Sequence, residues 1–431
     1  MAALLAVPLA AGPATAELAG HGGFVKGVDV SPDGRKVISA SFDYSLILWD
    51  LESQSQLRGF YEHEGGVNAV AFLGEGGKAV SAADDGTLRL WDTESGSLLH
   101  TFEGHQGKVA AVAVSPDGRT AASAGWDRTV RFWDLGARQP RKVLNGHANN
   151  VNAIAFSPKG DQVLTGSYDS ALRLWRVSDG NLLATLDGHD FGVTGLAFTP
   201  DGRRAVSVSV DESLRIWDLA TGRQEAALLG HEGSIFAVAV SPDGRLAATG
   251  GVDRVIRLWD LEAAKETQVL LGHDKPVWAL RFSPDGKKLI SAGSDEVLRV
   301  WDVESGLEIG SPGRTLALSR GDQPVDDGSR GAVLFRKCSV CHTVTAEGGN
   351  RAGPTLYGLF GRRAGSIEGY RYSDALTGSD LIWTEETVDA LFAEGPHEYT
   401  PGSKMPLQRM PDPEDRALLI AYLKRVTAPQ E

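Results

Sequence analysis

Short alternating runs of apolar and polar residues fill most of the chain up to about residue 318. A typical run is Val67–Phe72 (VNAVAF), and turns such as Ser115–Gly118 (SPDG) separate one run from the next. Alternation with a period of two predicts half-buried β-strands, while proline and glycine at fixed turn positions predict reversals of the chain. The pattern therefore predicts many short strands joined by tight turns.

The strand pattern repeats with a constant step of 42 residues. Histidines keep this step at His21, His63, His105, His147, His189, His231 and His273. Tryptophans keep it at Trp49, Trp91, Trp133, Trp175, Trp217, Trp259 and Trp301, and an aspartate precedes each by six residues, at Asp43, Asp85, Asp127, Asp169, Asp211, Asp253 and Asp295. Seven identical periods predict seven equivalent β units, which is the pattern of a β-propeller.

The Gly-His and Trp-Asp signatures at this period resemble WD-repeat proteins. The resemblance implies an all-β propeller with seven blades over residues 17–318. It also implies that each blade buries a hydrogen-bonded set formed by the histidine, the aspartate, the tryptophan and a serine or threonine four residues before the aspartate. That position holds Ser39, Ser81, Ser123, Thr165, Ser207, Thr249 and Ser291. The repeat histidines are therefore expected to be structural, and not metal ligands or general bases.

The constant spacing leaves no room for long loop insertions, on which grafted catalytic sites usually lie. We therefore expect the propeller to be a docking surface for proteins. In the WD-repeat family, partners often meet residues just before the blade aspartate or shortly after the Gly-His pair. Aromatic residues occupy such positions here, and aromatics are enriched in binding hot spots, although ordinary packing of strand ends explains them equally well. They are Phe42, Trp126, Tyr168, Phe236 and Trp278.

The first residues of the chain permit two interpretations. Residues 1–16 resemble a signal peptide, because residues 2–11 are apolar except for one proline and Ala14–Ala16 (ATA) resembles a cleavage site, but no lysine or arginine occurs before Lys26, so the signal peptide would be truncated. Alternatively, residues 10–18 supply the outer strand that closes the propeller ring. Cleavage after Ala16 is expected to exclude that closure, and the last blade would then take its outer strand from residues 306–318.

The chain contains two cysteines, and they form the pentapeptide Cys338–His342 (CSVCH). Two thiols at this spacing can add to the vinyl groups of a haem while the following histidine ligates the iron. A disulfide, a redox CxxC pair or half of a zinc site would also use two nearby cysteines, but zinc would need a second ligand pair, and no further cysteines exist. The motif favours one covalently bound haem c.

About sixty residues further on, the segment Tyr399–Pro406 (YTPGSKMP) presents Met405 between two prolines. Methionine sulfur opposite histidine nitrogen gives a six-coordinate iron with a raised reduction potential and no open position for substrate. Methionine is also a common core filler, but the surrounding proline, glycine and lysine are poor context for burial. Met405 is thus the expected second iron ligand, with Met410 a weaker candidate.

The segment 328–431 resembles class I cytochrome c of the mitochondrial and α-proteobacterial type. The resemblance rests on the CSVCHT motif, on Gly353–Arg362 (GPTLYGLFGR), on Gly369–Ala375 (GYRYSDA), on Trp383, on the Met405 loop and on Leu419–Leu423 (LIAYL). It implies an all-α domain with a helix over Gly331–Lys337 crossing a second over Asp412–Val426. It further implies that the Pro354 carbonyl accepts a hydrogen bond from His342, that Arg362, Tyr372 and Trp383 hold the haem propionates, and that Ser403 bonds near the Met405 loop.

The net negative charge of the chain limits the classes of partner that it can bind. The chain has a formal net charge of −13, and both the part up to residue 320 (−9) and the segment 321–431 (−4) are acidic, which disfavours nucleic-acid binding. No run of about 20 apolar residues predicts a membrane span. Four basic residues flank the haem ligands in sequence and suggest a positive rim that would steer an acidic redox partner, unless they are ordinary surface charge. They are Arg336, Lys337, Lys404 and Arg409.

Together these features predict a two-domain electron carrier: an all-β seven-bladed propeller, a linker at residues 319–327 and an all-α class I cytochrome c domain at residues 328–431. Bacterial c-type cytochromes receive haem outside the cytoplasm, so the resemblance implies the periplasm. Two alternatives stay open at this point. One is a redox enzyme whose propeller holds a second cofactor, and the other is a haem-based sensor or scaffold.

Overall fold

The structure is a computed structural model, which describes residues 18–74, 76–309, 329–339, 342–345, 354–368, 370, 372, 374–395, 399–400, 410 and 412–428. These residues fall into two compact units, which are described separately. The expected linker at residues 319–327 and the expected signal segment at residues 1–16 lie outside the described residues, and the expected domain boundaries stay predictions. No helix in the described ranges is long and apolar enough to cross a membrane.

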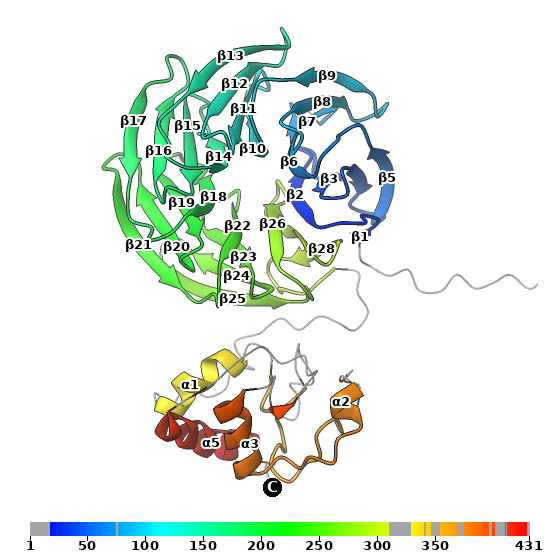
Figure 1. The fold of residues 1–431 in the computed structure, drawn as a ribbon, viewed down its shortest axis with the longest axis vertical. Helices are drawn as coiled ribbons and strands as arrows, with labels where there is room; N and C mark the ends of the chain where they lie inside the picture. The colour runs from blue at the N-terminus through cyan, green and yellow to red at the C-terminus, as the bar shows by residue number, and fades with distance from the viewer. Residues whose placement is uncertain are drawn as a thin grey trace, which may run out of the picture. The chain divides into compact units, whose positions relative to one another are not determined.

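The first unit consists of seven four-stranded antiparallel sheets arranged around a central axis (Figure 1). The innermost strands are β2 (Val25–Val30), β6 (Val67–Leu73), β10 (Val109–Val114), β14 (Val151–Phe156), β18 (Val193–Phe198), β22 (Ile235–Val240) and β26 (Val277–Phe282). The second strands are β3 (Lys36–Ser41), β7 (Lys78–Ala83), β11 (Thr120–Gly125), β15 (Gln162–Ser167), β19 (Arg204–Ser209), β23 (Leu246–Gly251) and β27 (Lys288–Gly293). The third strands are β4 (Leu46–Asp50), β8 (Leu88–Asp92), β12 (Val130–Asp134), β16 (Leu172–Arg176), β20 (Ser213–Asp218), β24 (Val255–Asp260) and β28 (Val297–Asp302).

The outer strands are β5 (Ser55–Phe60), β9 (Leu98–Phe102), β13 (Gln139–Leu144), β17 (Leu182–Leu186), β21 (Arg223–Leu229), β25 (Lys265–Leu271) and, in the last blade, β1 (Leu18–Ala19). This arrangement confirms the predicted seven-bladed propeller.

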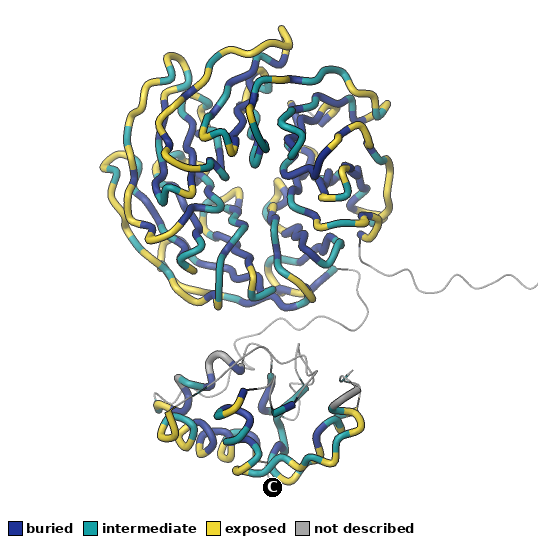
Figure 2. The backbone as a smooth tube through the Cα atoms, viewed as in Figure 1, coloured by how far each residue is buried: buried dark blue, intermediate teal, exposed yellow. Residues whose placement is uncertain are grey.

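The core of the propeller lies between successive blades. Each second strand is covered on both faces by neighbouring blades, and all six residues of β11 are buried. Ile38 and Leu48 of the first blade, for example, pack with Val70 and Trp91 of the second. Outer strands have one solvent-facing side, and the first four residues of β5 are exposed. Burial is therefore highest in the second strands and lowest in the outer strands, while the innermost strands mix buried and half-buried residues (Figure 2).

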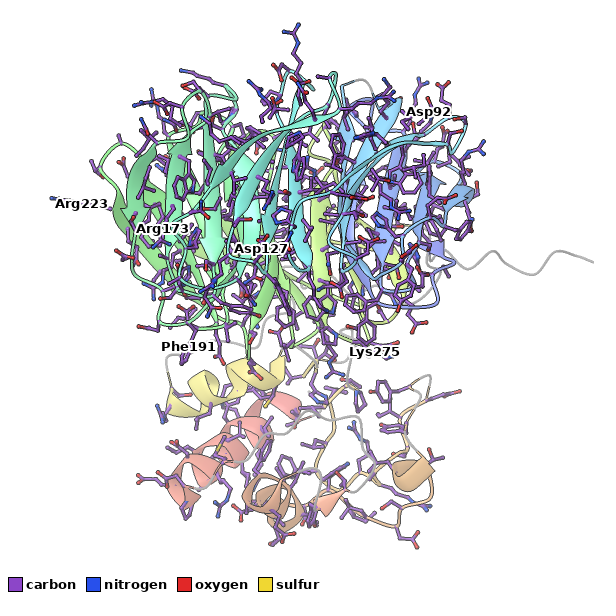
Figure 3. The ribbon with its side chains drawn as sticks, turned by 45° about the horizontal axis from the view of Figure 1, so that its top comes forward. Asp92, Asp127, Arg173, Phe191, Arg223 and Lys275 are labelled. Carbon is purple, nitrogen blue, oxygen red and sulfur yellow. The ribbon has the colours of Figure 1, made fainter. Side chains whose placement is uncertain are left out.

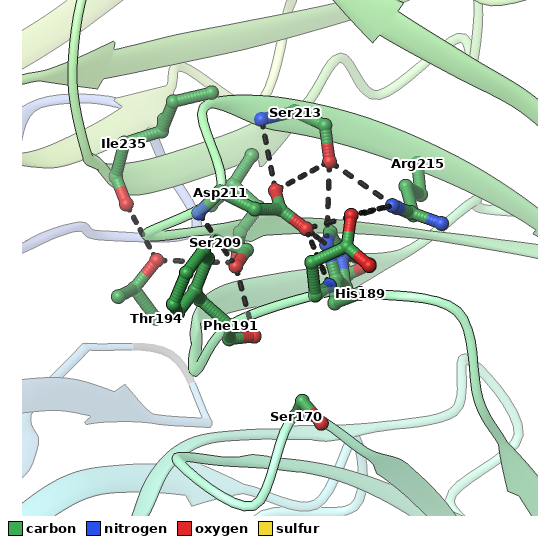
Figure 4. Close-up of polar contacts among 12 residues, drawn as sticks. Ser170, His189, Phe191, Thr194, Ser209, Asp211, Ser213, Arg215 and Ile235 are labelled. Carbon is green, nitrogen blue, oxygen red and sulfur yellow. Dashed lines mark hydrogen bonds and ion pairs between the residues drawn. The ribbon is translucent and has the colours of Figure 1, made fainter.

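The four-residue set predicted from the repeat is present in all seven blades. Each histidine Nε2 lies 2.6–2.8 Å from the serine or threonine hydroxyl, and each tryptophan Nε1 donates to the same hydroxyl at 2.8–2.9 Å. Each histidine Nδ1 lies 2.7–3.0 Å from a carboxylate oxygen of the blade aspartate. Figure 4 shows two members of the set in the fifth blade, His189 and Asp211, with the neighbouring polar side chains of Ser213 and Arg215. The repeat histidines are thus satisfied groups of the fold.

These sets make the propeller sensitive to acid. Burial lowers the pKa of His105, His147 and His189 below the ordinary value near 6.5, so the rings are neutral at pH 7. Burial opposes ionisation of Asp169 as well, but hydrogen bonds from the Ala148 N–H and from His147 lower its pKa to about 2. Both kinds of group bind protons more readily in the unfolded chain than in the folded one.

We therefore expect the free energy of unfolding to fall progressively as the pH drops below about 6.5, first because of the histidines and below about 4 because of the aspartates. Urea midpoints measured by far-UV circular dichroism between pH 8 and pH 4 test this. The midpoint should be nearly constant above pH 7.5. A midpoint that rises between pH 7 and pH 5 would contradict these pKa directions.

Ring closure uses both of the segments that the sequence left as alternatives. Leu18 pairs with Leu298 in β28, at the position that Phe60 occupies against Leu46 in the first blade. Further along the same edge of β28, Glu308 forms a bridge with Trp301. The outer strand of the last blade is therefore composite, with one part from each side of the propeller sequence.

A buried ion pair stabilises the part of this outer strand that contains Glu308. Both carboxylate oxygens of Glu308 accept from Arg299 Nη1, at 3.0 and 3.2 Å, and both side chains are almost completely buried. The pairing residues Leu18 and Ala19 follow Ala16 in the chain. The expectation that cleavage after Ala16 would exclude closure by the N-terminal segment is therefore wrong, because cleavage there would leave the pairing residues in place.

The second unit contains the helices α1 (Arg330–Ser339), α2 (Asp374–Thr377), α3 (Glu385–Glu394) and α5 (Pro413–Thr427). Asp412 caps α5 by accepting from the Glu414 N–H, and Pro413 occupies the first turn, where its missing N–H costs nothing. In α3, Thr384 and Thr387 form a reciprocal capping box. The two helices predicted from the sequence thus correspond to α1 and α5.

Helices α1 and α5 pack closely, as expected. The rings of Phe335 and Tyr422 lie 5.5 Å apart, and both belong to an apolar core that includes Val388 and Leu419. Gly331 allows the approach, because a Cβ at this position would lie 2.5 Å from Leu418 O and 2.7 Å from Tyr422 Cβ. The crossing therefore depends on the absence of a side chain at residue 331.

Replacing Gly331 with alanine should destabilise the second unit by about 1–3 kcal/mol, because the added methyl group forces the two helices apart. This cost outweighs the gain of roughly 1 kcal/mol that alanine brings to a helix. Thermal unfolding followed by near-UV circular dichroism measures the change. The control is Gly22→Ala, whose Cβ would meet no atom within 4 Å and which should leave the transition unchanged. An equally stable Gly331→Ala protein would contradict the close crossing.

Candidate functional site

The histidine of the CSVCH motif is held at the end of α1. Cys338 lies in the last turn of this helix, buried against the core of the second unit, and its carbonyl accepts a hydrogen bond of 2.9 Å from the His342 N–H. Cys341 lies outside the described residues. The structure thus fixes one cysteine and the histidine of the motif relative to each other.

The His342 ring has a defined hydrogen bond on one side. Its Nδ1 lies 2.7 Å from the backbone carbonyl oxygen of Pro354, which can only accept. Nδ1 must therefore carry the proton, and in the neutral ring Nε2 is the unprotonated nitrogen. This is the contact expected from the sequence. It orients the ring and selects the tautomer that a metal ion requires.

A short network joins the histidine segment to residues 354–357. Thr343 Oγ1 donates to Thr355 Oγ1 at 2.8 Å, and the Leu356 N–H donates to Thr343 O at 2.8 Å. The sequence analysis assigned no role to either threonine, although Thr343 directly follows the motif. These bonds fix the position of the Pro354 carbonyl relative to His342.

Arg362 supports the same segment. Its guanidinium donates to the carbonyl oxygens of Thr355 at 2.7 Å and Tyr357 at 2.6 Å. The guanidinium is half-buried, and burial lowers its pKa, against the opposing effect of Tyr372. A role in holding the backbone was not predicted, because the resemblance pointed only to haem propionates. The five N–H donors of an arginine allow both roles.

Trp383 and Arg362 are neighbours through the backbone. The Trp383 N–H donates to Arg362 O at 2.9 Å, and the Gly361 N–H donates to Trp383 O at 2.8 Å. The Trp383 ring packs against the core of the unit. Tyr372 lies with its ring 4.8 Å from that of Tyr370, and burial raises the pKa of its phenol. Arg362 and Trp383 are thus neighbours in this unit, and Tyr372 lies close enough to Arg362 to affect the pKa of its guanidinium.

The remaining expected site residues cannot be placed. Ser403, Met405, Lys404 and Arg409 lie outside the described residues, as do the side chains of Arg336 and Lys337. Met410, the weaker candidate ligand, packs against the core, and its N–H donates to Phe392 O at 2.8 Å. Ligation by a methionine and the positive rim remain predictions.

The propeller carries the expected aromatic residues. Phe42, Trp126 and Tyr168 are exposed, while Phe236 and Trp278 are half-buried and stack on each other with ring centroids 4.0 Å apart and planes at 4°. Phe24 and Phe191 are further exposed aromatics that the sequence analysis did not select, although they follow the blade histidines by three and two residues. Figure 3 shows Phe191 and Lys275 on one face of the propeller and Asp92 on the opposite face.

Comparison with known proteins gives two family matches. The model described as WD domain, G-beta repeat matches residues 12–50, 54–92, 96–134, 138–176, 180–218, 222–260 and 264–302. The model described as Cytochrome c matches residues 328–427.

Individual relatives match the same C-terminal part. The chain is 45% identical to a cytochrome c of Gibberella zeae over 102 residues, which is 23% of this chain and 95% of that protein. It is 42% identical to a cytochrome c of Arabidopsis thaliana, over 23% of this chain and 90% of the relative, and 41% identical to one of Theileria parva, over 24% and 90%.

Proposed function

Because the chain belongs to the WD-repeat family and ends in a domain of the cytochrome c family, we propose that it is an electron carrier whose propeller binds a redox partner protein. The cytochrome c domain indicates haem and electron transfer, and the WD-repeat propeller indicates protein interaction. The observation that carries the proposal is the hydrogen bond from His342 Nδ1 to Pro354 O. It selects the tautomer whose Nε2 is unprotonated and can ligate iron, in a domain of matching sequence.

The residues that are present fit a haem c. Cys338, buried against the apolar core, and Cys341 would supply the two thioether bonds, and His342 Nε2 would be one axial ligand. When bound, the haem supplies a one-electron iron couple. The chain's own contribution is to hold the His342 ring through Pro354 and to surround it with apolar residues. An imidazole that donates to a carbonyl is a stronger electron donor to a metal.

In this proposal the domain is of class I, and Met405 would be the second ligand of the haem iron. A methionine there closes the coordination of the iron, so that the site passes electrons and offers no position for substrate. In this proposal Ser403 would hydrogen-bond near this loop. Arg362, Tyr372 and Trp383 hold the propionates, and the proximity of Trp383 and Tyr372 to Arg362 supports that role.

We further propose that the protein acts in the periplasm, where bacterial c-type cytochromes receive their haem. Arg336, Lys337, Lys404 and Arg409 would form a positive rim beside the haem ligands and would speed encounter with an acidic redox partner. Fractionation of cells followed by haem staining of denatured protein on a gel tests the compartment and the covalent bond together. A haem that separates from the protein on denaturation would contradict thioether attachment.

A redox titration tests the carrier function. The matured full-length protein should show a single reversible transition with the slope of a one-electron couple, with one set of c-type absorption bands. Turnover of small oxidants is not expected. A second chromophore, or a second transition that belongs to the propeller, would contradict the proposal and favour a redox enzyme with a second cofactor.

A further inference from the structure

One end of the innermost propeller strands holds a lysine between two aromatic rings. Lys26 is the second residue of β2, and its Nζ lies 5.0 Å from the ring centroids of both Phe42 and Trp278. It also donates to Asn68 Oδ1 at 3.2 Å. Asn68, Phe236 and Trp278 are the second residues of β6, β22 and β26. We refer to Lys26, Phe42, Asn68, Phe236 and Trp278 as the Lys26 cluster.

The aromatic rings of the Lys26 cluster are fixed by their surroundings. The ring of Phe42 lies against Gly66, where an added Cβ would come within 3.2 Å of it. Trp278 is held by its stacking on Phe236 and by a hydrogen bond of 2.6 Å from its Nε1 to Ser294 Oγ. Rigid aromatic residues lose little conformational entropy on binding, which favours their use as anchors.

The charges around the Lys26 cluster do not balance. Asp84 pairs directly with Lys108 at 2.6 Å, and Lys108 also lies over the ring of Trp126. Asp84 is linked to Lys26 only through Asn68, whose Nδ2 donates to Asp84 Oδ1 at 2.8 Å. Within the described residues, no carboxylate lies within 4 Å of Lys26 Nζ. Two ammonium groups thus share one carboxylate.

Burial increases the effect of this charge imbalance on the Lys26 ammonium. Burial lowers the pKa of Lys26, with Asp84 acting in the opposite direction and Lys108 in the same one. A partly desolvated ammonium gains most from a direct charged hydrogen bond, because the surrounding rings reduce screening by water. An ammonium also has three N–H donors, of which the contact with Asn68 uses one.

Acidic residues lie on several loops at the same end of the propeller. Glu64, Asp190, Glu232 and Asp274 follow the histidines of four blades and are exposed, and the Asp190 side chain is 81% exposed. These residues lie on loops that lead into the innermost strands at the end where the Lys26 cluster lies. An extended acidic segment would meet repulsion there. A single carboxylate with neutral or basic neighbours would not.

We propose that the Lys26 cluster is the anchor site for a partner protein that inserts one aspartate or glutamate side chain, with its carboxylate on Lys26 and its stem between Phe42 and Trp278. The partner's neighbouring residues are neutral or basic and face the acidic loop residues Glu64, Asp190, Glu232 and Asp274. This inference rests on the proposed docking role of the propeller and names the chemistry that the docked partner presents.

The test uses the full-length, haem-loaded protein and three immobilised libraries of amidated octapeptides, which have a central aspartate, asparagine or lysine and neutral residues elsewhere. The unmodified protein should bind the aspartate library about tenfold more than the asparagine library, as expected for a partly desolvated charge pair. Lys26→Gln should reduce that ratio to about one, and Lys26→Arg should retain most of it. The control Lys265→Gln changes an exposed lysine on β25 and should leave the ratio unchanged.

Three results would overturn the inference: no preference for aspartate in the unmodified protein, an unchanged preference in Lys26→Gln, or strongest binding of the lysine library. The urea midpoint of Lys26→Gln shows whether the variant is folded, and Lys26→Arg tests the charge with little change in volume. The haem spectrum is recorded on the same samples. Failure of the carrier proposal would appear in that spectrum, and failure of this inference would appear only in peptide binding.

Discussion

Replacing Met405 with alanine should convert a closed haem site into one that binds carbon monoxide. Without the methionine sulfur, the ferrous iron keeps His342 and gains an open position, so that carbon monoxide binding should change from undetectable to stoichiometric. The reduction potential should also fall, because methionine ligation raises it. Optical spectra of the dithionite-reduced protein, with and without carbon monoxide, measure the first effect, and a redox titration measures the second.

The matched control is Met410→Leu. Met410 packs against the core of the second unit, and leucine conserves most of its volume, so this variant should keep the spectrum of the unmodified protein. If Met410→Leu binds carbon monoxide and Met405→Ala does not, then the assignment of the second ligand to Met405 is wrong.

Replacing Ser207 with alanine should destabilise the propeller by about 2–5 kcal/mol. The Ser207 hydroxyl is bonded to His189 Nε2 at 2.7 Å and to Trp217 Nε1 at 2.8 Å, and all three side chains are buried. Alanine leaves both nitrogens without this partner, and each buried unpaired polar group costs roughly 1–3 kcal/mol. Urea unfolding monitored by tryptophan fluorescence measures the change.

Ser178→Ala is the control for this variant, because Ser178 is exposed in a turn, and its removal should change the free energy of unfolding by less than about 0.5 kcal/mol. A Ser207→Ala protein with an unchanged urea midpoint would mean that the buried set contributes little to stability. The haem spectrum should be the same in both variants, since neither residue belongs to the second unit.

The repeating features of the propeller were predictable because each residue of the repeat acts within its own blade. Histidine, serine or threonine, aspartate and tryptophan keep their spacing, so the bonds they form could be inferred residue by residue. Ring closure was not predictable in this way. A two-residue strand, Leu18–Ala19, carries no periodicity of its own, and the bridge of Glu308 depends on where the two ends of the propeller meet.

The second unit also contains contacts that were predictable from the sequence and contacts that were not. The contact between His342 and Pro354 followed from a motif with a known partner, but the two hydrogen bonds from Arg362 to backbone carbonyls did not, because carbonyl acceptors leave no trace in the side-chain pattern. Three aromatic members of the Lys26 cluster, Phe42, Phe236 and Trp278, were expected to contact partners, but Lys26 and Asn68 were not. The members of this cluster lie on the first, second, sixth and seventh blades, and only the closed ring brings Lys26 and Trp278 together.

The closed coordination of the iron is the central claim, and carbon monoxide binding to the unmodified, fully reduced protein tests it most directly. The account predicts low-spin c-type bands that do not change when carbon monoxide is added at neutral pH. Rapid and complete conversion to a carbon monoxide complex would contradict it, because the iron would then have an open position, as a sensor or an enzyme requires.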